Sequence, residues 1–236
     1  MGRGNVSNRL LGQNTPFAVR EAFNSLRTNL MYTVKGDDGC PIYGITSYRE
    51  GAGKSTVIAN LAISFCYTSQ KVLLIDSDMR HSTQCGLFGL DEDHPGLSEL
   101  LSKIEPDDSK VIQHIPSLSL DVVTAGQVPP NPSELIMSDR FNTLLEKWRQ
   151  KYDVIFIDFP PVGIVTDALA PSKTVTGYIM TVRAEKDNVQ KVNETIAAIR
   201  SVDAKILGVV VNGVDAKGMY HNHAYGYEKK KSGKSH

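Results

Sequence analysis

The apolar residues of this chain gather in short continuous runs, and between most of these runs they recur at helical spacing. A short apolar run bounded by turn residues is typical of a strand that is buried on both faces in a parallel sheet. The predicted strands are Ile42–Thr46, Val72–Ile75, Leu120–Val123, Val154–Ile157, Tyr178–Val182 and Ile206–Val211. The predicted helices are Pro16–Tyr32, Lys54–Thr68, Ser98–Ser102, Pro132–Tyr152, Thr166–Ser172 and Val189–Val202. Because strands and helices alternate, the pattern predicts an α/β fold with a doubly wound, mostly parallel sheet in a single domain.

Length and charge limit the organisation further. The 236 residues suit one α/β domain with an ample core. The polar residues 1–15 are predicted to be a mobile N-terminus, residues 16–217 the folded domain, and residues 218–236 a flexible tail that carries tyrosines. Lysine plus arginine number 26, as do aspartate plus glutamate, so the overall charge does not point to nucleic acid as a partner.

Cysteines and hydrophobic segments indicate the compartment. Cys40, Cys66 and Cys85 are widely spaced and form no Cys-x-x-Cys pair, which indicates a reduced cytoplasm and no structural metal. No apolar run approaches the roughly 18 residues of a membrane span, and the polar segment Gly2–Arg9 lacks the apolar core of a signal peptide. We therefore expect a soluble protein that would need a partner for any role at a membrane.

Residues 45–56, Ile-Thr-Ser-Tyr-Arg-Glu-Gly-Ala-Gly-Lys-Ser-Thr, join an apolar strand to a helix through a glycine-containing turn. This is the layout of a phosphate-binding loop, in which backbone N–H groups and the helix N-terminus hold a polyphosphate. Lys54 would reach the outer phosphates and Ser55 would be a magnesium ligand. The usual pattern has a glycine where this chain has Tyr48, so the match is imperfect. The predicted nucleotide-binding residues of the loop are Gly51, Ala52, Gly53, Lys54, Ser55 and Thr56.

Two of the predicted strands are followed directly by aspartate. The strand before Asp158 has the form of a Walker B strand, whose terminal carboxylate belongs to the magnesium shell. The other strand is followed by Asp76 and Asp78, which would both face the phosphates if the backbone stays extended. One of them could then serve the metal while the other orients or deprotonates an attacking hydroxyl. The alternative is that Asp78 caps a turn and pairs with Arg80.

Motifs that occur in order along the chain carry a resemblance to a known family. They are Lys54–Thr56, Leu74–Arg80, Pro129–Leu135 and Ile157–Pro161. Each motif is shared with other P-loop ATPases, but the set is specific, above all the run Pro-Pro-Asn-Pro-Ser-Glu-Leu. With this set the chain resembles the cytoplasmic domain of the bacterial tyrosine kinases (BY-kinases) that control capsular and exopolysaccharide synthesis. The resemblance covers about residues 16–227 and implies a fold of the P-loop NTPase type.

The resemblance implies an ATP- and Mg²⁺-dependent protein-tyrosine kinase. Lys54, Asp76 and Asp78 would be its catalytic residues, with Asp76 as the base for the tyrosine hydroxyl. Ser55, Asp78 and Asp158 would form the metal shell. These roles follow from the positions that the residues hold in the family's motifs.

Asn212 follows the last predicted strand, where related nucleotide-binding folds place an asparagine that contacts adenine. A simple turn residue before Gly213 is an equally open interpretation.

Tyr220, Tyr225 and Tyr227 lie within the last 17 residues. This segment follows the final predicted strand and has no sustained hydrophobic period, so packing of all three rings is not expected. A mobile tail with hydroxyl groups beside a phosphoryl-transfer site is the arrangement that autophosphorylation requires. Each phosphate would add nearly two negative charges to the tail. The alternative is an ordinary tail that happens to contain aromatic residues.

The chain departs from the family in three places, one of which is that its tyrosine-rich tail is short. Tyr48 and Glu50 replace the small residue or proline often seen in the loop. The family's oligomerisation motif, Glu-x-x-Arg-x-x-Arg, has Asn24 as its middle residue here, between Glu21 and Arg27. The three side chains share one helix face, but the lost charge predicts a homo-oligomer whose ring is weaker than the family's.

The resemblance also implies partners. Because the sequence has no membrane span, a separate transmembrane activator of the polysaccharide co-polymerase type would recruit this cytoplasmic protein to the inner face of the membrane. Cytoplasmic proteins with tyrosines would be its substrates.

Other functions remain open at the level of the sequence. A partition or septum-placement type P-loop ATPase, which is a nucleotide-dependent dimer switch, carries a signature lysine where this chain has Arg49. A non-catalytic, nucleotide-gated partner of a polysaccharide exporter is a third class. Incubation with labelled ATP would separate the classes, since the label would appear on tyrosine, as free phosphate, or on neither.

Overall fold

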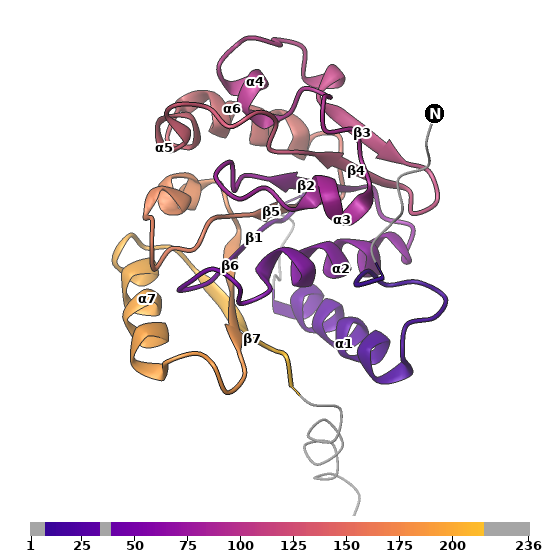
Figure 1. Cartoon of the computed structure of the whole chain (residues 1–236), viewed down its shortest axis with the longest axis vertical. Helices are drawn as coiled ribbons and strands as arrows, with labels where there is room; N and C mark the ends of the chain where they lie inside the picture. Colours follow the sequence, from indigo (N-terminus) through magenta and orange to yellow (C-terminus); the bar gives the residue numbers. More distant parts are fainter. Residues whose placement is uncertain (1–7, 34–38, 215–236) are drawn as a thin grey trace, which may run out of the picture.

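The computed structural model describes residues 8–33 and 39–214 and contains one seven-stranded sheet with helices on both faces (Figure 1). The strand order is β3-β4-β2-β5-β1-β6-β7. Only β3 runs antiparallel to its neighbour, β4, while the other pairs of adjacent strands are parallel. The predicted α/β class and the doubly wound, mostly parallel sheet are therefore confirmed.

The elements have the following bounds. The strands are β1 Ile42–Thr46, β2 Val72–Asp76, β3 Ile112–Ile115, β4 Leu120–Val123, β5 Val154–Asp158, β6 Gly177–Arg183 and β7 Ile206–Asn212. The α-helices are α1 Phe17–Thr33, α2 Lys54–Cys66, α3 Gln84–Phe88, α4 Leu97–Leu101, α5 Pro132–Ile136, α6 Asp139–Arg149 and α7 Val189–Ser201. Two 3₁₀ segments, η1 Asp108–Lys110 and η2 Asp167–Lys173, complete the described fold.

The sheet separates two apolar cores. Every residue of β1, β2 and β5 is buried, which explains why these strands read as continuous apolar runs. Successive side chains of β5 alternate between the cores, with Ile155 and Ile157 packing among residues of α4, α5 and α6. Val154 and Phe156 pack on the opposite face with residues of α1 and α2. Figure 1 shows these two groups of helices on opposite sides of the sheet.

The structure differs from the predicted elements in three respects. The helix expected over residues 166–172 is the 3₁₀ segment η2, with non-helical backbone angles at Pro171. The helix expected over residues 132–152 is divided into α5 and α6, because Ser138 adopts an extended conformation (ψ 145°) as the N-cap residue of α6. The edge strand β3 and the helix α3 were not predicted. The sequence of β3, Ile-Gln-His-Ile, is short and mixed in polarity, and it lies at the edge where only one neighbour pairs with it.

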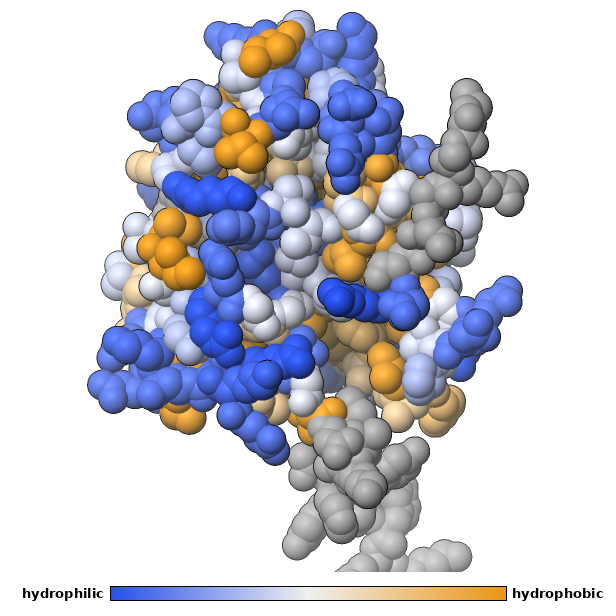
Figure 2. All heavy atoms as spheres, viewed as in Figure 1, coloured by the Kyte–Doolittle hydropathy of each residue, from blue (hydrophilic) through white to orange (hydrophobic). Residues whose placement is uncertain are grey.

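The visible surface is mostly hydrophilic, with apolar residues in small separate patches (Figure 2). Within residues 8–33 and 39–214, every helix is too short or too polar to span a bilayer.

The aromatic centre of the second core provides a test of this packing. Phe156 is fully buried, and its ring centroid lies 5.1 Å from that of Phe65 and 5.6 Å from that of Tyr43. We expect Phe156→Ala to lower the free energy of unfolding by about 3–5 kcal/mol, because it removes buried apolar area and leaves a cavity. Chemical denaturation followed by circular dichroism measures the change. The matched control is Phe17→Ala at a side chain that is 72% exposed, where a change of similar size would contradict the assignment of the core.

Candidate functional site

The predicted phosphate-binding loop connects β1 to α2 at the carboxyl edge of the sheet. Gly51 and Gly53 have positive φ angles of 75° and 90°, a conformation that glycine adopts without strain. A Cβ atom on Gly53 would lie 2.0 Å from the side-chain nitrogen of Asn212, so any other residue would displace Asn212 and strain the backbone. The loop therefore presents the N-terminus of α2, with its unpaired backbone N–H groups, to any anion bound at this edge.

Lys54 lies at the centre of an acidic cluster. Its Nζ atom is 2.8 Å from Oδ2 of Asp78, 3.3 Å from Oδ1 of Asp158 and 3.4 Å from the hydroxyl of Ser55. Burial opposes the charge of this lysine, but the carboxylates of Asp158 and Asp78 outweigh that effect and raise its pKa. Lys54 is therefore a buried cation that neutralises two carboxylates at the entrance to the loop.

Asp76 lies deeper than Asp78. It is fully buried at the end of β2, directly opposite Asp158 of β5 in the sheet register. Its Oδ2 atom accepts hydrogen bonds from the hydroxyl of Ser82 and from the backbone N–H groups of Thr83 and Gln84, each at 3.0 Å. Burial and the nearby charge of Asp158 raise the pKa of Asp76 to about 7.

The two carboxylates of this motif do not face the same space, contrary to the expectation from an extended backbone. The strand ends at Asp76, whose Oδ1 atom accepts a hydrogen bond from the N–H of Asp78 (3.1 Å), so the chain turns between them. Asp78 lines the cavity at the phosphate loop, whereas Asp76 points to residues 82–84. Asp78 also accepts a bond from the N–H of His81 (3.2 Å), as a turn-capping residue would, while its other oxygen contacts Lys54. Both interpretations of Asp78 thus describe part of its geometry.

Gln84 is a site residue that no motif indicated. Its side-chain Nε2 donates to Oδ2 of Asp158 (2.8 Å) and to the backbone oxygen of Ser55 (3.2 Å). The residue is fully buried, and its Oε1 atom has no hydrogen-bond partner among the described residues. Gln84 therefore links the carboxylate of Asp158 to the first turn of α2 and fixes the position of both.

Asn212 contacts the phosphate loop. At the end of β7, its side-chain nitrogen donates to the backbone oxygen of Ala52 (3.0 Å), and the residue lines the same cavity as Lys54 and Arg183. Of the two interpretations, its placement in the site is thus supported by geometry. A contact with adenine stays a prediction.

A salt bridge also connects the phosphate-binding loop to a neighbouring loop. Arg49 makes a salt bridge to Asp187 in the β6–α7 connection, with Nη2 and Nε at 2.6 and 2.7 Å from the same carboxylate oxygen. The guanidinium also lies 5.7 Å from the ring centroid of Tyr48, a cation–π distance. The residue at the signature-lysine position of the switch ATPases is therefore engaged within its own chain.

The N-terminal segment packs against α2 where a mobile end was expected. Of residues 1–15, the structure describes residues 8–15, and in these Leu10 and Leu11 are buried. The side chain of Asn60 accepts a hydrogen bond from the N–H of Leu11 (2.6 Å) and donates one to the backbone oxygen of Arg9 (3.0 Å). These two hydrogen bonds hold the backbone at Arg9, whose side chain lines the cavity at the phosphate-binding loop. The polar composition of the segment did not indicate this packing.

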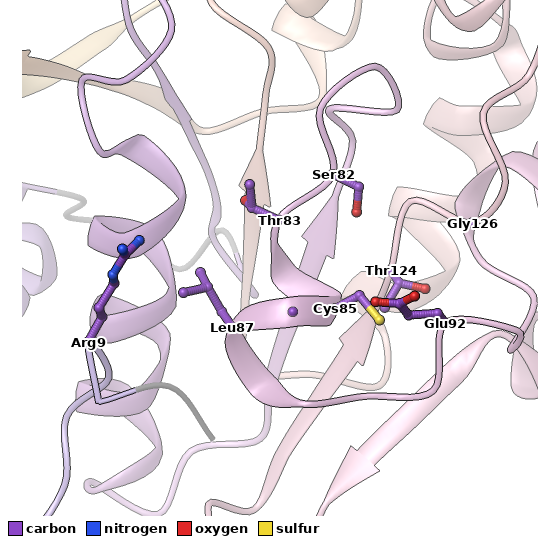
Figure 3. A pocket seen from close by; sticks show the side chains of 9 residues that line it. Arg9, Ser82, Thr83, Cys85, Leu87, Glu92, Thr124 and Gly126 are labelled. Atoms are coloured by element: carbon purple, nitrogen blue, oxygen red, sulfur yellow. The ribbon is translucent and has the colours of Figure 1, made fainter. Parts of the chain in front are cut away.

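Two neighbouring cavities open at this edge. The loop cavity, about 680 Å³, is lined by residues that include Gly53, Lys54, Thr56, Asp78, Arg183 and Asn212. The side cavity, about 530 Å³, is lined by residues that include Ser82, Cys85, Gly86, Glu92, Thr124 and Gly126 (Figure 3). The two cavities share Arg9, Thr83 and Leu87.

The structure thus brings most of the predicted site residues together. The loop residues 51–56, Asp78, Asp158 and Asn212 surround or adjoin the loop cavity, with Asp76 behind it. Tyr220, Tyr225 and Tyr227 lie outside the described residues.

Comparison with known proteins agrees with this geometry. A family model described as ParA, NUBPL iron-transfer P-loop NTPase, matches residues 41–233. CapB of Staphylococcus aureus is 36% identical over 195 residues, which cover 82% of this chain and 84% of CapB. The tyrosine-protein kinase Etk of Escherichia coli is 36% identical over 194 residues, but this chain spans only 26% of the length of Etk.

Two solved structures resemble this chain to different degrees. The kinase domain of Escherichia coli Etk superposes with a TM-score of 0.79 at 34% identity, covering 89% of this chain and 84% of that domain. The septum site-determining protein MinD from Pyrococcus horikoshii has a TM-score of 0.62 at 21% identity, covering 77% of this chain and 76% of MinD. The second likeness shows a shared fold alone.

The buried position of Asp76 predicts how stability depends on pH. Because its folded-state pKa is raised from 3.8 to about 7, the folded protein binds more protons than the unfolded chain between these values. Asp76 therefore lowers stability as the pH rises from about 4 to about 7. Asp76→Asn cannot ionise, so we expect its stability relative to wild type to improve by about 1.4 kcal/mol or more between pH 5 and pH 8.

Denaturant unfolding at the two pH values measures this difference. With its single oxygen turned toward residues 82–84, the asparagine presents its NH₂ group to the N–H of Asp78 and loses that hydrogen bond at either pH. A constant difference in stability from wild type is therefore expected in addition to the pH-dependent one. An offset that is the same at pH 5 and pH 8 would show that Asp76 keeps an ordinary pKa.

Proposed function

This chain belongs to the bacterial tyrosine kinase (BY-kinase) family of P-loop NTPases, and we propose that it transfers the terminal phosphate of ATP to tyrosine hydroxyl groups. The observation that carries the proposal is the cluster at the phosphate loop, where Lys54 contacts Asp78 and Asp158 and Asp76 lies directly behind. A phosphoryl-transfer site needs a cation for the phosphates, oxygen ligands for a metal, and a group for the attacking hydroxyl. By analogy with the relatives, we further propose a role in capsular or exopolysaccharide synthesis.

The residues at the loop fit a magnesium ion. Mg²⁺ prefers oxygen donors, and in nucleotide sites it is held by one or two carboxylates together with substrate phosphates and water. Ser55, Asp78 and Asp158 offer a hydroxyl and two carboxylates of this kind. Within the described residues, no group of three His, Cys, Asp or Glu side chains could hold a metal by itself, so the nucleotide would complete the shell. The ion would neutralise charge on the phosphates.

The roles of the protein groups follow from their positions. The loop N–H groups and Lys54 would bind the phosphates, and Asp78 would serve the metal because it lines the loop cavity. Asp76 would orient the tyrosine hydroxyl or take its proton, and a pKa of about 7 suits a base that works near neutral pH. Asn212, with Arg183 beside it in the cavity lining, would hold the base of the nucleotide.

A nucleotide-dependent dimer switch is the alternative function. It is the weaker one, because the relatives at 34–36% identity are named tyrosine-protein kinases, whereas the MinD likeness concerns the fold alone. In addition, Arg49 is paired with Asp187 of the same chain, and it would have to give up this salt bridge to reach a nucleotide in a partner subunit.

The assembly that we propose is a weak homo-oligomer recruited to the inner face of the membrane by a transmembrane activator. In α1, Asn24 donates to the carboxylate of Glu21 (2.9 Å), and Arg27 donates to the backbone oxygen of Ser64 in α2. Of this motif, the arginine is thus used within the chain, which supports a weak ring. Cytoplasmic proteins with tyrosines would be further substrates.

Replacement of Lys54 tests the site. We expect Lys54→Met to reduce tyrosine phosphorylation about 100-fold or more, because no cation then meets the outer phosphates. The change also leaves Asp78 and Asp158 without their buried partner, so it should destabilise the fold. Lys54→Arg keeps the charge and serves as the folded control.

Labelled ATP and a phosphotyrosine antibody measure the transfer, and thermal unfolding measures the stability. Wild-type labelling by a folded Lys54→Met protein would refute the assignment of the site.

Transfer to the tail is expected to occur between subunits. The test mixes Lys54→Met, whose tail is intact, with an active protein in which Tyr220, Tyr225 and Tyr227 are replaced by phenylalanine. Phosphotyrosine on the Lys54→Met chain is the expected result, and added phosphate should then weaken the assembly through repulsion from the acidic cluster. An unlabelled Lys54→Met chain, together with wild type that labels itself at a rate independent of concentration, would mean that each tail enters its own active site.

A further inference from the structure

We infer that Gln84 makes the metal site selective for Mg²⁺ over Ca²⁺, because it leaves Asp158 a single oxygen with which to bind the ion. The inference rests on the proposed function, since it names a positioning residue for the magnesium that a phosphoryl-transfer site uses. Gln84 is the first residue of α3, and no motif of the sequence gives it a role. It would act on the metal only through Asp158 and Ser55, with which its side chain forms hydrogen bonds.

The orientation of the Gln84 amide follows from its neighbours. Its Nε2 atom donates to Oδ2 of Asp158 at 2.8 Å and to the backbone oxygen of Ser55 at 3.2 Å. A carboxylate and a backbone carbonyl both accept hydrogen bonds, so turning the amide would set its oxygen against two other oxygens. The backbone N–H of the same residue donates to Oδ2 of Asp76 at 3.0 Å, which holds the start of α3 in place. The amide nitrogen is therefore fixed on Asp158.

The two oxygens of Asp158 consequently have different partners. Oδ2 accepts the hydrogen bond from Gln84, whereas Oδ1 lies 3.3 Å from Nζ of Lys54. The same Nζ atom is 3.4 Å from the hydroxyl of Ser55, so Oδ1 is the oxygen on the side of the proposed metal ligands. An ion that bound both oxygens of Asp158 would have to displace the amide of Gln84, which is fully buried.

Asp78, the other carboxylate of the proposed metal shell, is restricted in the same way. Its Oδ1 atom accepts a hydrogen bond from the backbone N–H of His81 at 3.2 Å, and its Oδ2 atom lies 2.8 Å from Nζ of Lys54. Each carboxylate thus offers one oxygen to the site while an N–H group holds the other. For Asp158 the donor belongs to a side chain, so Gln84 is the position at which a substitution tests this restriction.

The number of oxygens that a carboxylate offers matters because the two ions differ in coordination. Mg²⁺ requires a compact octahedral shell, and in nucleotide sites it takes one or two carboxylates together with phosphates and water. Ca²⁺ accepts about six to eight oxygens and binds carboxylates through one oxygen or through both. Two carboxylates that each present one oxygen therefore suit the smaller ion. Release of Oδ2 of Asp158 would add a ligand for the larger one.

The glutamine is retained at a cost in stability. Its Oε1 atom is buried and has no hydrogen-bond partner within residues 8–33 and 39–214, and a buried acceptor without a donor is unfavourable. Methionine has the same length and would fill this space without an unpaired oxygen. What Gln84 adds to packing is therefore the N–H group on Asp158.

The test compares substitutions that remove this donor with one that keeps it. Gln84→Met has no donor, and Gln84→Asn draws the amide back by one methylene, so the inference can be tested even where one of the two does not fold. Gln84→His retains a ring N–H that can donate to Asp158. Gln70→Met is the matched control, because the side-chain oxygen of Gln70 is also buried without a partner in the part of the chain that the structure describes. That residue precedes β2, at the end of the strand away from the site.

For each protein, binding of a fluorescent ADP analogue is titrated with Mg²⁺ and with Ca²⁺. The ratio of the two metal dissociation constants gives the selectivity, and thermal unfolding without nucleotide verifies the fold. We expect wild type to prefer Mg²⁺, and Gln84→Met and Gln84→Asn to lower this preference about tenfold or more, since partners of metal ligands have effects of this size. Gln84→His and Gln70→Met should keep the preference within about threefold of wild type.

The outcomes separate this inference from the proposed function. A role in packing alone would weaken the binding of both ions equally, so an unchanged ratio in Gln84→Met and Gln84→Asn overturns the inference. The same loss of preference in Gln70→Met would show a general effect of packing and would also overturn it. Wild type whose nucleotide affinity depends on neither ion would overturn the proposed magnesium-dependent function together with the inference.

Discussion

The interaction on which the site depends is the neutralisation of buried carboxylates by Lys54. Parallel pairing of β2 with β5 places Asp76 directly opposite Asp158, so two carboxylates are buried side by side at the carboxyl edge of the sheet. Ionising both carboxylates of such a neighbouring pair costs much free energy where water is excluded. The positive charge of Lys54 offsets the negative charges of Asp158 and Asp78, while Gln84 donates a further hydrogen bond to Asp158. The position of α2, which carries Lys54, is thus coupled to the two central strands.

The same constraint explains the course of the chain after β2. Asp76 lacks a direct contact with Lys54, and its carboxylate is stabilised instead by two backbone N–H groups and a hydroxyl from residues 82–84. The chain must therefore turn back over the strand end, which begins α3 at Gln84 and brings its side chain onto Asp158. A change of charge at any of these carboxylates would be transmitted to α3, and hence to the boundary between the two cavities.

Much of this arrangement could be predicted from the sequence, for physical reasons that differ between elements. Strands such as β5 are buried on both faces and must be apolar throughout, so their runs are easily recognised. Lys54, Asp78 and Asp158 could be found because their chemistry requires fixed spacings from a strand end or a glycine turn. The strand β3 pairs on one side only and needs no apolar run, so its short mixed sequence gave no signal. The turning of Asp76 away from Asp78 depends on backbone donors that lie seven and eight residues later, which local patterns cannot reveal.

The contacts that were not predicted all connect the phosphate-binding loop and α2 to the segments around them. Asn60 recognises the backbone of the N-terminal segment through both atoms of its amide, a contact that leaves no trace in side-chain patterns on the partner. That contact and α3 together place Arg9, Thr83 and Leu87 where the two cavities meet. The recognisable motifs therefore account for the glycine loop and for Lys54, Asp78 and Asp158. The segments that surround them have no motif, because a hydrogen bond to a backbone group can be made whatever side chain that backbone carries.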